Sequence, residues 1–165
     1  MIKKVYVPKY IYPLSSVLFN YIIFAISLIV LVVVSIVLKV YPTVSLLQAI
    51  IPLILLLITA FGVGMILSTM AVFFRDLEYL WSVGLMIIMY ASAIFYKPDR
   101  LLKSGFGWIL KCNPLYLLIH NFRQAVFGMP MNLKFLAASV VFAIVSVIVG
   151  LVFFYKKQDE FILHI

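Results

Sequence analysis

The sequence of 165 residues is poor in the residue types that build most soluble enzyme sites. Its single cysteine, Cys112, excludes an internal disulfide framework and a cysteine-based metal site. Its two histidines, His120 and His164, lie far apart in the chain and are too few for a metal site of their own. We therefore expect no metal site and no cofactor bound by this chain.

Acidic side chains are also scarce, and their positions argue against two classes of transporter. All of them lie in connections or in the tail, whereas ion- or proton-coupled carriers generally place a carboxylate inside the membrane. The chain also lacks the glycine-rich phosphate loop ending in Lys-Ser/Thr that ATP hydrolysis needs. Energy for any transport is therefore expected to come from a partner. The acidic residues are Asp76, Glu78, Asp99, Asp159 and Glu160.

Apolar length is what the sequence has in excess. Hydrophobic residues make up 67% of the chain and charged residues only 11%, with a mean hydropathy of +1.25. A soluble domain of this size cannot bury so much apolar surface. The net charge of +8 comes from scattered basic residues rather than one basic face, so no nucleic-acid partner is expected. The lipid bilayer is the predicted solvent for most of the chain.

Four apolar segments are long enough to cross a bilayer, which takes about 20 apolar residues. They are predicted to be helices, because a lone strand in lipid would leave its backbone groups unpaired. The sequence thus predicts an all-α integral membrane protein, one membrane domain over residues 1–165, with both termini on the same side. Basic residues divide almost evenly between the two sides, so charge leaves the orientation open. The predicted spans are about 17–38, 46–74, 80–96 and 135–155.

The connection 97–133 differs from an ordinary polar loop. Its apolar pieces are broken by Asn113-Pro114 and by the run 128–130, which predicts two short helices. Such helices could re-enter the membrane, where irregular backbone must be buried in protein or line a wet cavity. They could equally lie at the membrane interface. The sequence favours neither arrangement.

Three small residues, Ala60, Gly64 and Ser68, recur every fourth position in the second predicted span. Small residues on one helix face let neighbouring helices approach closely. We predict that this stripe packs against another helix, with contact to a substrate as the lesser alternative.

Aromatic residues gather around the third predicted span. Tyr90, Phe95 and Tyr96 could stack on sugar rings along a glycan path. Aromatic side chains near the ends of spans more often anchor a helix at the lipid interface. The anchor interpretation is favoured except for Tyr90, which lies deeper in its span, where a phenol needs a partner or water.

A charged connection, Arg75-Asp76-Leu77-Glu78, joins the second and third predicted spans. The plainer interpretation is a solvated turn whose arginine complements the negative end of the preceding helix dipole. The functional interpretation is a rigid contact point for a soluble partner. The residues alone leave both open.

The order of these segments resembles the ABC-2 type polysaccharide-export permeases, the membrane subunits of teichoic-acid, O-antigen and capsule exporters. Residues 4–15 resemble the entry to the family's third membrane helix, and 73–81 its connection between helices four and five. Residues 93–96 resemble the end of helix five, Asn113 to Tyr116 with Arg123 the external re-entrant region, and 154–161 the cytoplasmic tail. The resemblance covers nearly the whole chain in order.

The resemblance implies a permease subunit that pairs with a second copy and carries polysaccharide or lipid-linked glycan outward across the cell membrane. A separate ATPase subunit would hold ATP and Mg²⁺, both termini would be cytoplasmic, and 97–133 would face outside. The implied ATPase-coupling residues are Lys4, Tyr6, Pro8, Arg75 and Asp76, and the implied external gate comprises Asn113, Pro114, Tyr116 and Arg123.

One departure from the family pattern concerns length. Family members have six spans after an amphipathic helix, and this sequence begins where their third helix begins. We therefore expect a truncated permease, a fragment of one, or a chain whose missing part another polypeptide supplies. The rival interpretations are a small non-transporting interaction or assembly protein, the product of a decayed gene, or a membrane enzyme acting on lipid-linked sugars. The sequence does not distinguish the three kinds of polysaccharide.

Overall fold

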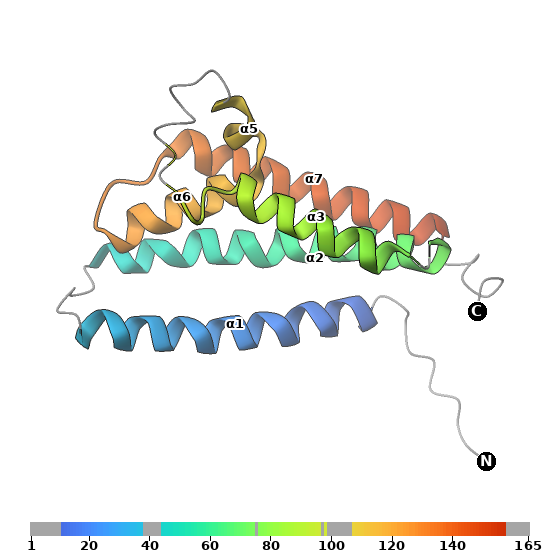
Figure 1. Cartoon of the computed structure of the whole chain (residues 1–165), viewed down its shortest axis with the longest axis horizontal. Coiled ribbons are helices and arrows are strands. Elements are labelled where there is room, and N and C mark those ends of the chain that lie inside the picture. The colour runs from blue at the N-terminus through green and yellow to red at the C-terminus, as the bar shows by residue number, and fades with distance from the viewer. Residues whose placement is uncertain (1–10, 38–43, 75, 97, 99–106, 158–165) are drawn as a thin grey trace, which may run out of the picture.

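A computed structural model of the chain describes residues 11–37, 44–74, 76–96, 98 and 107–157. The regular structure within these ranges is helical, which confirms the predicted all-α class (Figure 1). The helices are α1 (Ile11–Val37), the 3₁₀ helix η1 (Val44–Ala49), α2 (Ile50–Phe73), α3 (Leu77–Ala91), α5 (Gly107–Cys112), α6 (Pro114–Val126) and α7 (Leu133–Lys157).

Three helical segments of the described chain are long and apolar enough to cross a membrane: Ile11–Val37, Leu46–Phe73 and Leu133–Lys157. They match the first, second and fourth predicted spans and support a multi-pass membrane protein. The described part of the first helix starts at Ile11, earlier than predicted, and includes Pro13. A proline has a backbone angle that suits the early part of a helix.

The predicted third span, 80–96, is not among these three segments. The helix in that region, α3, has 15 residues, which gives a length of about 22 Å, whereas the hydrocarbon core is about 30 Å thick. The chain turns out of α3 at Ser92 and Ala93, and the backbone of Ala93 adopts a φ of 51°. This left-handed conformation is a common way to end a helix. The count of four spans is therefore not confirmed.

The centre of the bundle is the contact between α2 and α7, which lie side by side (Figure 1). A Cβ atom placed on Gly62 would lie 2.5 Å from the backbone carbon of Ser146, and one on Gly150 would lie 2.5 Å from the carbonyl oxygen of Gly62. Only hydrogen-sized side chains allow this approach. Most of the buried residues of α7 are small, namely Ser139, Ala143, Ser146 and Gly150, and the large Phe154 is buried near the end of the helix.

The predicted small-residue stripe lies beside this contact rather than in it. Gly64 faces α1, since a Cβ there would lie 3.1 Å from Val17 Cγ2. Ser68 is half-buried and donates its hydroxyl to the carbonyl of Met65, and Ala60 is exposed. Within the described residues, the tightest helix contact of α2 is thus at Gly62, which the sequence analysis missed. A packing role for Ala60 stays a prediction.

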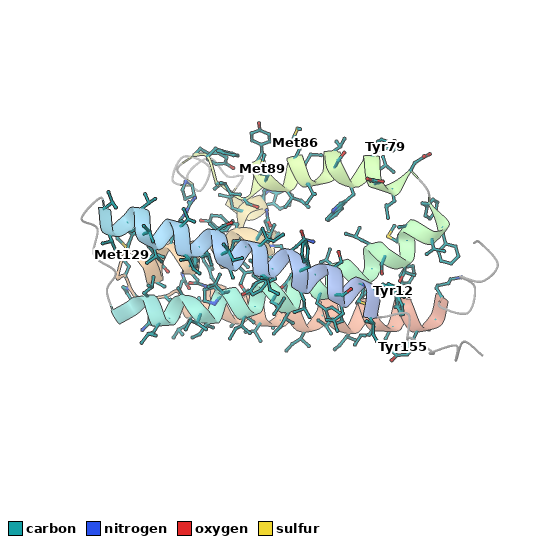
Figure 2. The ribbon with its side chains drawn as sticks, turned by 90° about the horizontal axis from the view of Figure 1, so that it is seen from below. Tyr12, Tyr79, Met86, Met89, Met129 and Tyr155 are labelled. Atoms are coloured by element: carbon teal, nitrogen blue, oxygen red, sulfur yellow. The ribbon has the colours of Figure 1, made fainter. Side chains whose placement is uncertain are left out.

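One end of the bundle gathers the start of α1, the end of α2, the start of α3 and the end of α7 (Figure 1). Three exposed tyrosines, Tyr12, Tyr79 and Tyr155, lie at this end in the side-chain view (Figure 2). Tyrosines concentrate at membrane–water interfaces, where an apolar ring and a polar hydroxyl are both accommodated. The opposite end, where Met129 lies, joins α6 to α7.

Candidate functional site

The end of α3 meets α6 in a polar contact that we call the α3–α6 junction, comprising Ser92, Ala93, Ile94, Asn113 and Arg123. These residues come from opposite sides of the long connection, 21 to 30 positions apart in sequence. Two of the predicted gate residues, Asn113 and Arg123, supply the side chains from α6. The junction is therefore the most specific polar arrangement that the sequence-predicted residues form.

Asn113 joins the start of α6 to the end of α3. Its Oδ1 accepts a hydrogen bond from the backbone N–H of Leu115 at 3.0 Å, and its Nδ2 donates to Ser92 Oγ at 3.0 Å. Ser92 Oγ in turn donates to the carbonyl of Ile88 at 2.6 Å. Asparagine followed by proline is a favourable helix start, which explains why α6 begins at Pro114.

Arg123 reaches the same end of α3 from further along α6. Its Nη1 donates to the carbonyl of Ala93 and its Nη2 to the carbonyl of Ile94, both at 3.2 Å. Both carbonyls belong to the turn that follows α3, and a cation near the end of a helix is favoured by the helix dipole. Arg123 therefore holds the turn after α3 to α6 across the long connection.

The predicted gate residue Tyr116 lies in the apolar part of this contact. It is 2% exposed and clusters with Ala93, Leu110 and Leu117. Its ring also lies 6.3 Å from the ring of Phe135 on α7. Tyr116 thus fixes α6 between the end of α3 and the start of α7, while Pro114 occupies the first turn of α6.

A second polar group that the sequence analysis missed holds the turn between α6 and α7. The backbone N–H of Asn132 donates to Asn121 Oδ1 at 3.0 Å and to Gln124 Oε1 at 3.1 Å. Asn132 Oδ1 accepts from the backbone N–H groups of Lys134 and Phe135, which caps the start of α7. Asn121 is fully buried. An asparagine in an apolar helix is the signal that could have identified it.

His120 lies next to this group, with its ring 5.1 Å from that of Phe135. Burial lowers the pKa of His120, and the positive charge of Arg123 lowers it further. The neutral imidazole is therefore favoured near neutral pH. Among the described residues no group of three His, Cys, Asp or Glu side chains lies together as metal ligands would.

The aromatic residues Tyr90, Phe95 and Tyr96 form a cluster around the end of α3. The rings of Tyr90 and Phe95 lie 6.1 Å apart, and the hydroxyl of Tyr96 donates to the carbonyl of Tyr90 at 2.9 Å. All three side chains are exposed in the single chain. Both the glycan-path and the lipid-anchor interpretations stay predictions.

The predicted coupling residues lie largely outside the described part of the chain, namely Lys4, Tyr6, Pro8 and Arg75. Asp76 is described: it is exposed, precedes α3, and makes no side-chain hydrogen bond to the start of that helix. It lies at the end of the bundle that carries Tyr12 and Tyr155 (Figure 1). A coupling role for this turn stays a prediction.

Comparisons with known proteins give a consistent result. A family model described as ABC-2 type transporter matches residues 4–127. Two curated proteins from Klebsiella pneumoniae, both named O-antigen export system permease protein RfbA, are 34% and 32% identical to this chain over 163 residues, or 98% of its length. The chain spans 62% of the length of each of these relatives. No solved structure matches.

Proposed function

The chain belongs to the ABC-2 type transporter family, and we propose that it is the membrane-spanning permease part of an ATP-driven exporter of cell-surface polysaccharide or lipid-linked glycan. The observation that carries this proposal is the match along 98% of the chain to two O-antigen export permeases. The three long apolar helices support it, since a permease must line a path through the bilayer. O-antigen is the favoured cargo, because both relatives are named for its export.

In this proposal the chain itself hydrolyses no ATP. A partner ATPase binds ATP and Mg²⁺ and contacts the cytoplasmic end of the bundle through Lys4, Tyr6 and Pro8, together with Arg75 and Asp76. A second copy of the permease completes the path. The gate residues Asn113, Pro114, Tyr116 and Arg123 close its external end, and Tyr90, Phe95 and Tyr96 line its wall.

The proposed coupling between these two ends runs along α3. This helix begins beside Asp76 and ends in the α3–α6 junction. None of its residues is buried, so it is held mainly at its ends. A displacement of the charged turn by the ATPase would therefore pass along α3 to Arg123 and Asn113, and so to the gate helix α6.

The proposed topology has four crossings with both termini in the cytoplasm. The start of α1 and the end of α7 lie at the same end of the bundle (Figure 1). That end carries the exposed tyrosines and also Lys156 and Lys157, which suit the cytoplasmic interface. The third crossing consists of α3 and the turn that follows it, with α5 and α6 filling the external half beside it.

Deletion of the gene in its native organism tests the proposal. We expect loss of the surface polysaccharide together with accumulation of the same glycan inside the cell, since synthesis continues while export stops. Surface glycan is measured with lectins or antisera on intact cells, and internal glycan after permeabilisation. A plasmid copy of the gene, together with any adjoining sequence it is transcribed with, should restore export.

Other outcomes would contradict the proposal. Unchanged surface and internal glycan would indicate a non-transporting membrane protein. Loss of surface glycan without internal accumulation would indicate a role in synthesis, as a membrane enzyme would have. In the restored strain, Arg75→Glu should reduce both export and co-purification of the ATPase. The control is Lys134→Glu at the start of α7, away from the proposed ATPase contact, which should leave ATPase co-purification unchanged.

A further inference from the structure

An apolar cavity of about 270 Å³ lies between α1, α2 and α6. From α6 it is lined by Leu115, Leu118, Ile119 and Phe122, which recur at the spacing of one helix face. The polar residues of α6 that form the α3–α6 junction are not part of this lining. Helix α6 thus has a polar side toward α3 and an apolar side toward the cavity.

The chemistry of the cavity wall restricts what can occupy it. All the lining residues are apolar, including Phe24, Leu28 and Leu31 of α1 and Pro52, Leu53 and Leu56 of α2. A sugar, a phosphate headgroup or a water molecule placed there would lose its hydrogen bonds without compensation. Apolar cavities of this kind stay free of water and accept apolar ligands. The occupant must therefore be apolar.

The cavity is continuous with the surface that faces lipid. Leu31 lines the cavity and is also 47% exposed, and no residue of α1 is buried. Within the described chain, the cavity therefore opens onto the apolar outer surface of α1 without a polar barrier. Packing in a membrane depends on van der Waals contact, so an unfilled space of this size would leave its lining without partners.

Defined contacts set the positions of the helices around the cavity. The hydroxyl of Tyr21 donates to the carbonyl of Leu53 at 3.0 Å and joins α1 to α2 beside the cavity. The other wall, α6, is joined to the end of α3 by Asn113 and Arg123 in the α3–α6 junction.

We propose that the cavity binds an acyl chain of a bilayer phospholipid as a wedge between α1 and the gate helix α6. An apolar cavity of about 150 Å³ admits one benzene molecule, so this one accommodates about ten carbon atoms of a chain. The headgroup stays at the membrane surface and contributes nothing to recognition. The inference does not depend on what the protein transports.

Tryptophan quenching by brominated lipid tests this binding in the full chain. The native Trp81 and Trp108 are first replaced by phenylalanine, and Phe122→Trp then places a reporter in the cavity wall. The protein is reconstituted in vesicles of phosphatidylcholine brominated at successive acyl positions. Ile29→Trp, on the exposed face of α1, is the positive control, and the 2% exposed Phe154→Trp is the negative control.

We expect Phe122→Trp to lose at least half as much fluorescence as Ile29→Trp. Filling the cavity with Leu28→Phe and Leu56→Phe should reduce that loss at least twofold. The same substitutions at exposed positions outside the cavity, Leu18→Phe and Leu47→Phe, should leave it unchanged. Circular dichroism of each variant confirms that its helix content is retained.

Two results would overturn the proposal. Quenching of Phe122→Trp no stronger than that of Phe154→Trp would mean that the cavity is empty or filled by protein. Strong quenching that the filling substitutions do not reduce would mean that the acyl chain lies on the outer surface and does not enter.

Discussion

The contact between α2 and α7 and the junction between α3 and α6 hold helices together in opposite ways. At Gly62 and Gly150 the two backbones lie so close that not even a methyl group fits between them. At the α3–α6 junction, Asn113 and Arg123 reach across to the end of α3 through side-chain hydrogen bonds. The first contact is made by the absence of side chains, and the second by long polar ones.

The difference bears on which parts of the molecule can move. Close backbone packing has one geometry, and any shift of α2 against α7 would lose many van der Waals contacts at once. A few hydrogen bonds to the end of a helix can instead follow a displacement while staying formed. We therefore expect the contact between α2 and α7 to be the rigid part of the bundle, and the α3–α6 junction to tolerate displacement of α3.

The largest expected effect comes from adding one methyl group to the contact between α2 and α7. Gly62→Ala would place a Cβ 2.5 Å from Ser146, so α2 and α7 must separate, at a cost of about 3 kcal/mol. Thermal unfolding in detergent micelles, followed by size-exclusion chromatography, measures the loss. The matched control is Gly84→Ala, where the added Cβ would lie 3.9 Å from its nearest neighbour, Trp81. Equal stability of the two variants would contradict the close contact.

Removing the contact of Arg123 with the turn after α3 should have the next largest effect. Arg123→Ala leaves the carbonyls of Ala93 and Ile94 without their guanidinium donor, which costs about 2 kcal/mol for hydrogen bonds to a charged group. In contrast to Gly62→Ala, this variant should retain the α2–α7 contact and lose export more than stability. Unfolding and export assays run in parallel measure both losses. Lys134→Ala, an exposed cation at the start of α7, is the control and should change neither.

A smaller difference is expected between two glycine substitutions near the end of α3. Ala93 has a φ of 51°, which costs a non-glycine residue about 1–2 kcal/mol. Ala93→Gly removes that cost, but it gives the unfolded chain more freedom and removes a buried methyl group, worth about 0.8 kcal/mol, from the cluster with Tyr116. These contributions nearly cancel, so the unfolding midpoint should change little. Ala91→Gly, in the last turn of α3, should destabilise the protein by about 1 kcal/mol, and an equal loss of stability in the two variants would refute this.

The smallest effect concerns pH. The pKa of His120 lies below its ordinary value of 6.5 because of burial and the charge of Arg123. The folded state therefore resists protonation more than the unfolded state does. Its stability should be complete above pH 6.5 and fall as pH drops through the lowered pKa. Unfolding midpoints between pH 5 and 8 measure this fall, and His120→Phe should flatten the profile. A wild-type midpoint that rises as the pH falls would contradict the assignment.

The sequence predicted the apolar framework well because long uncharged runs have few alternatives in lipid. The segments 17–38, 46–74 and 135–155 all correspond to long helices. The third predicted span did not, since nothing in the run 80–96 indicates that Ala93 would adopt a left-handed backbone. The left-handed backbone conformation of Ala93 depends on its contacts with α6, because alanine itself does not prefer that conformation.

The candidate site was predicted only in part, because it also depends on contacts between residues that lie far apart in the chain. Asn113 and Arg123 were identified by resemblance, but their common target, the end of α3, depends on contacts 21 to 30 residues apart in the chain. The sequence did not predict the close contact at Gly62, because glycines are frequent in membrane helices. Gly62 and Gly64 differ in their neighbours in the fold, which are Ser146 of α7 and Val17 of α1.

The central claim is that Arg123 acts by holding α6 to the end of α3, and a chemical bridge tests it most directly. Ser92→Cys and Asn113→Cys introduce a thiol pair at the other end of α6, with Cys112→Ser removing the native thiol, all in the Arg123→Ala protein. A short bis-methanethiosulfonate reagent then joins the pair through two disulfide bonds. Bridging should restore the export lost with Arg123, and a reductant, which cleaves both disulfides, should abolish it again. Export that stays at the Arg123→Ala level after complete bridging would contradict this claim.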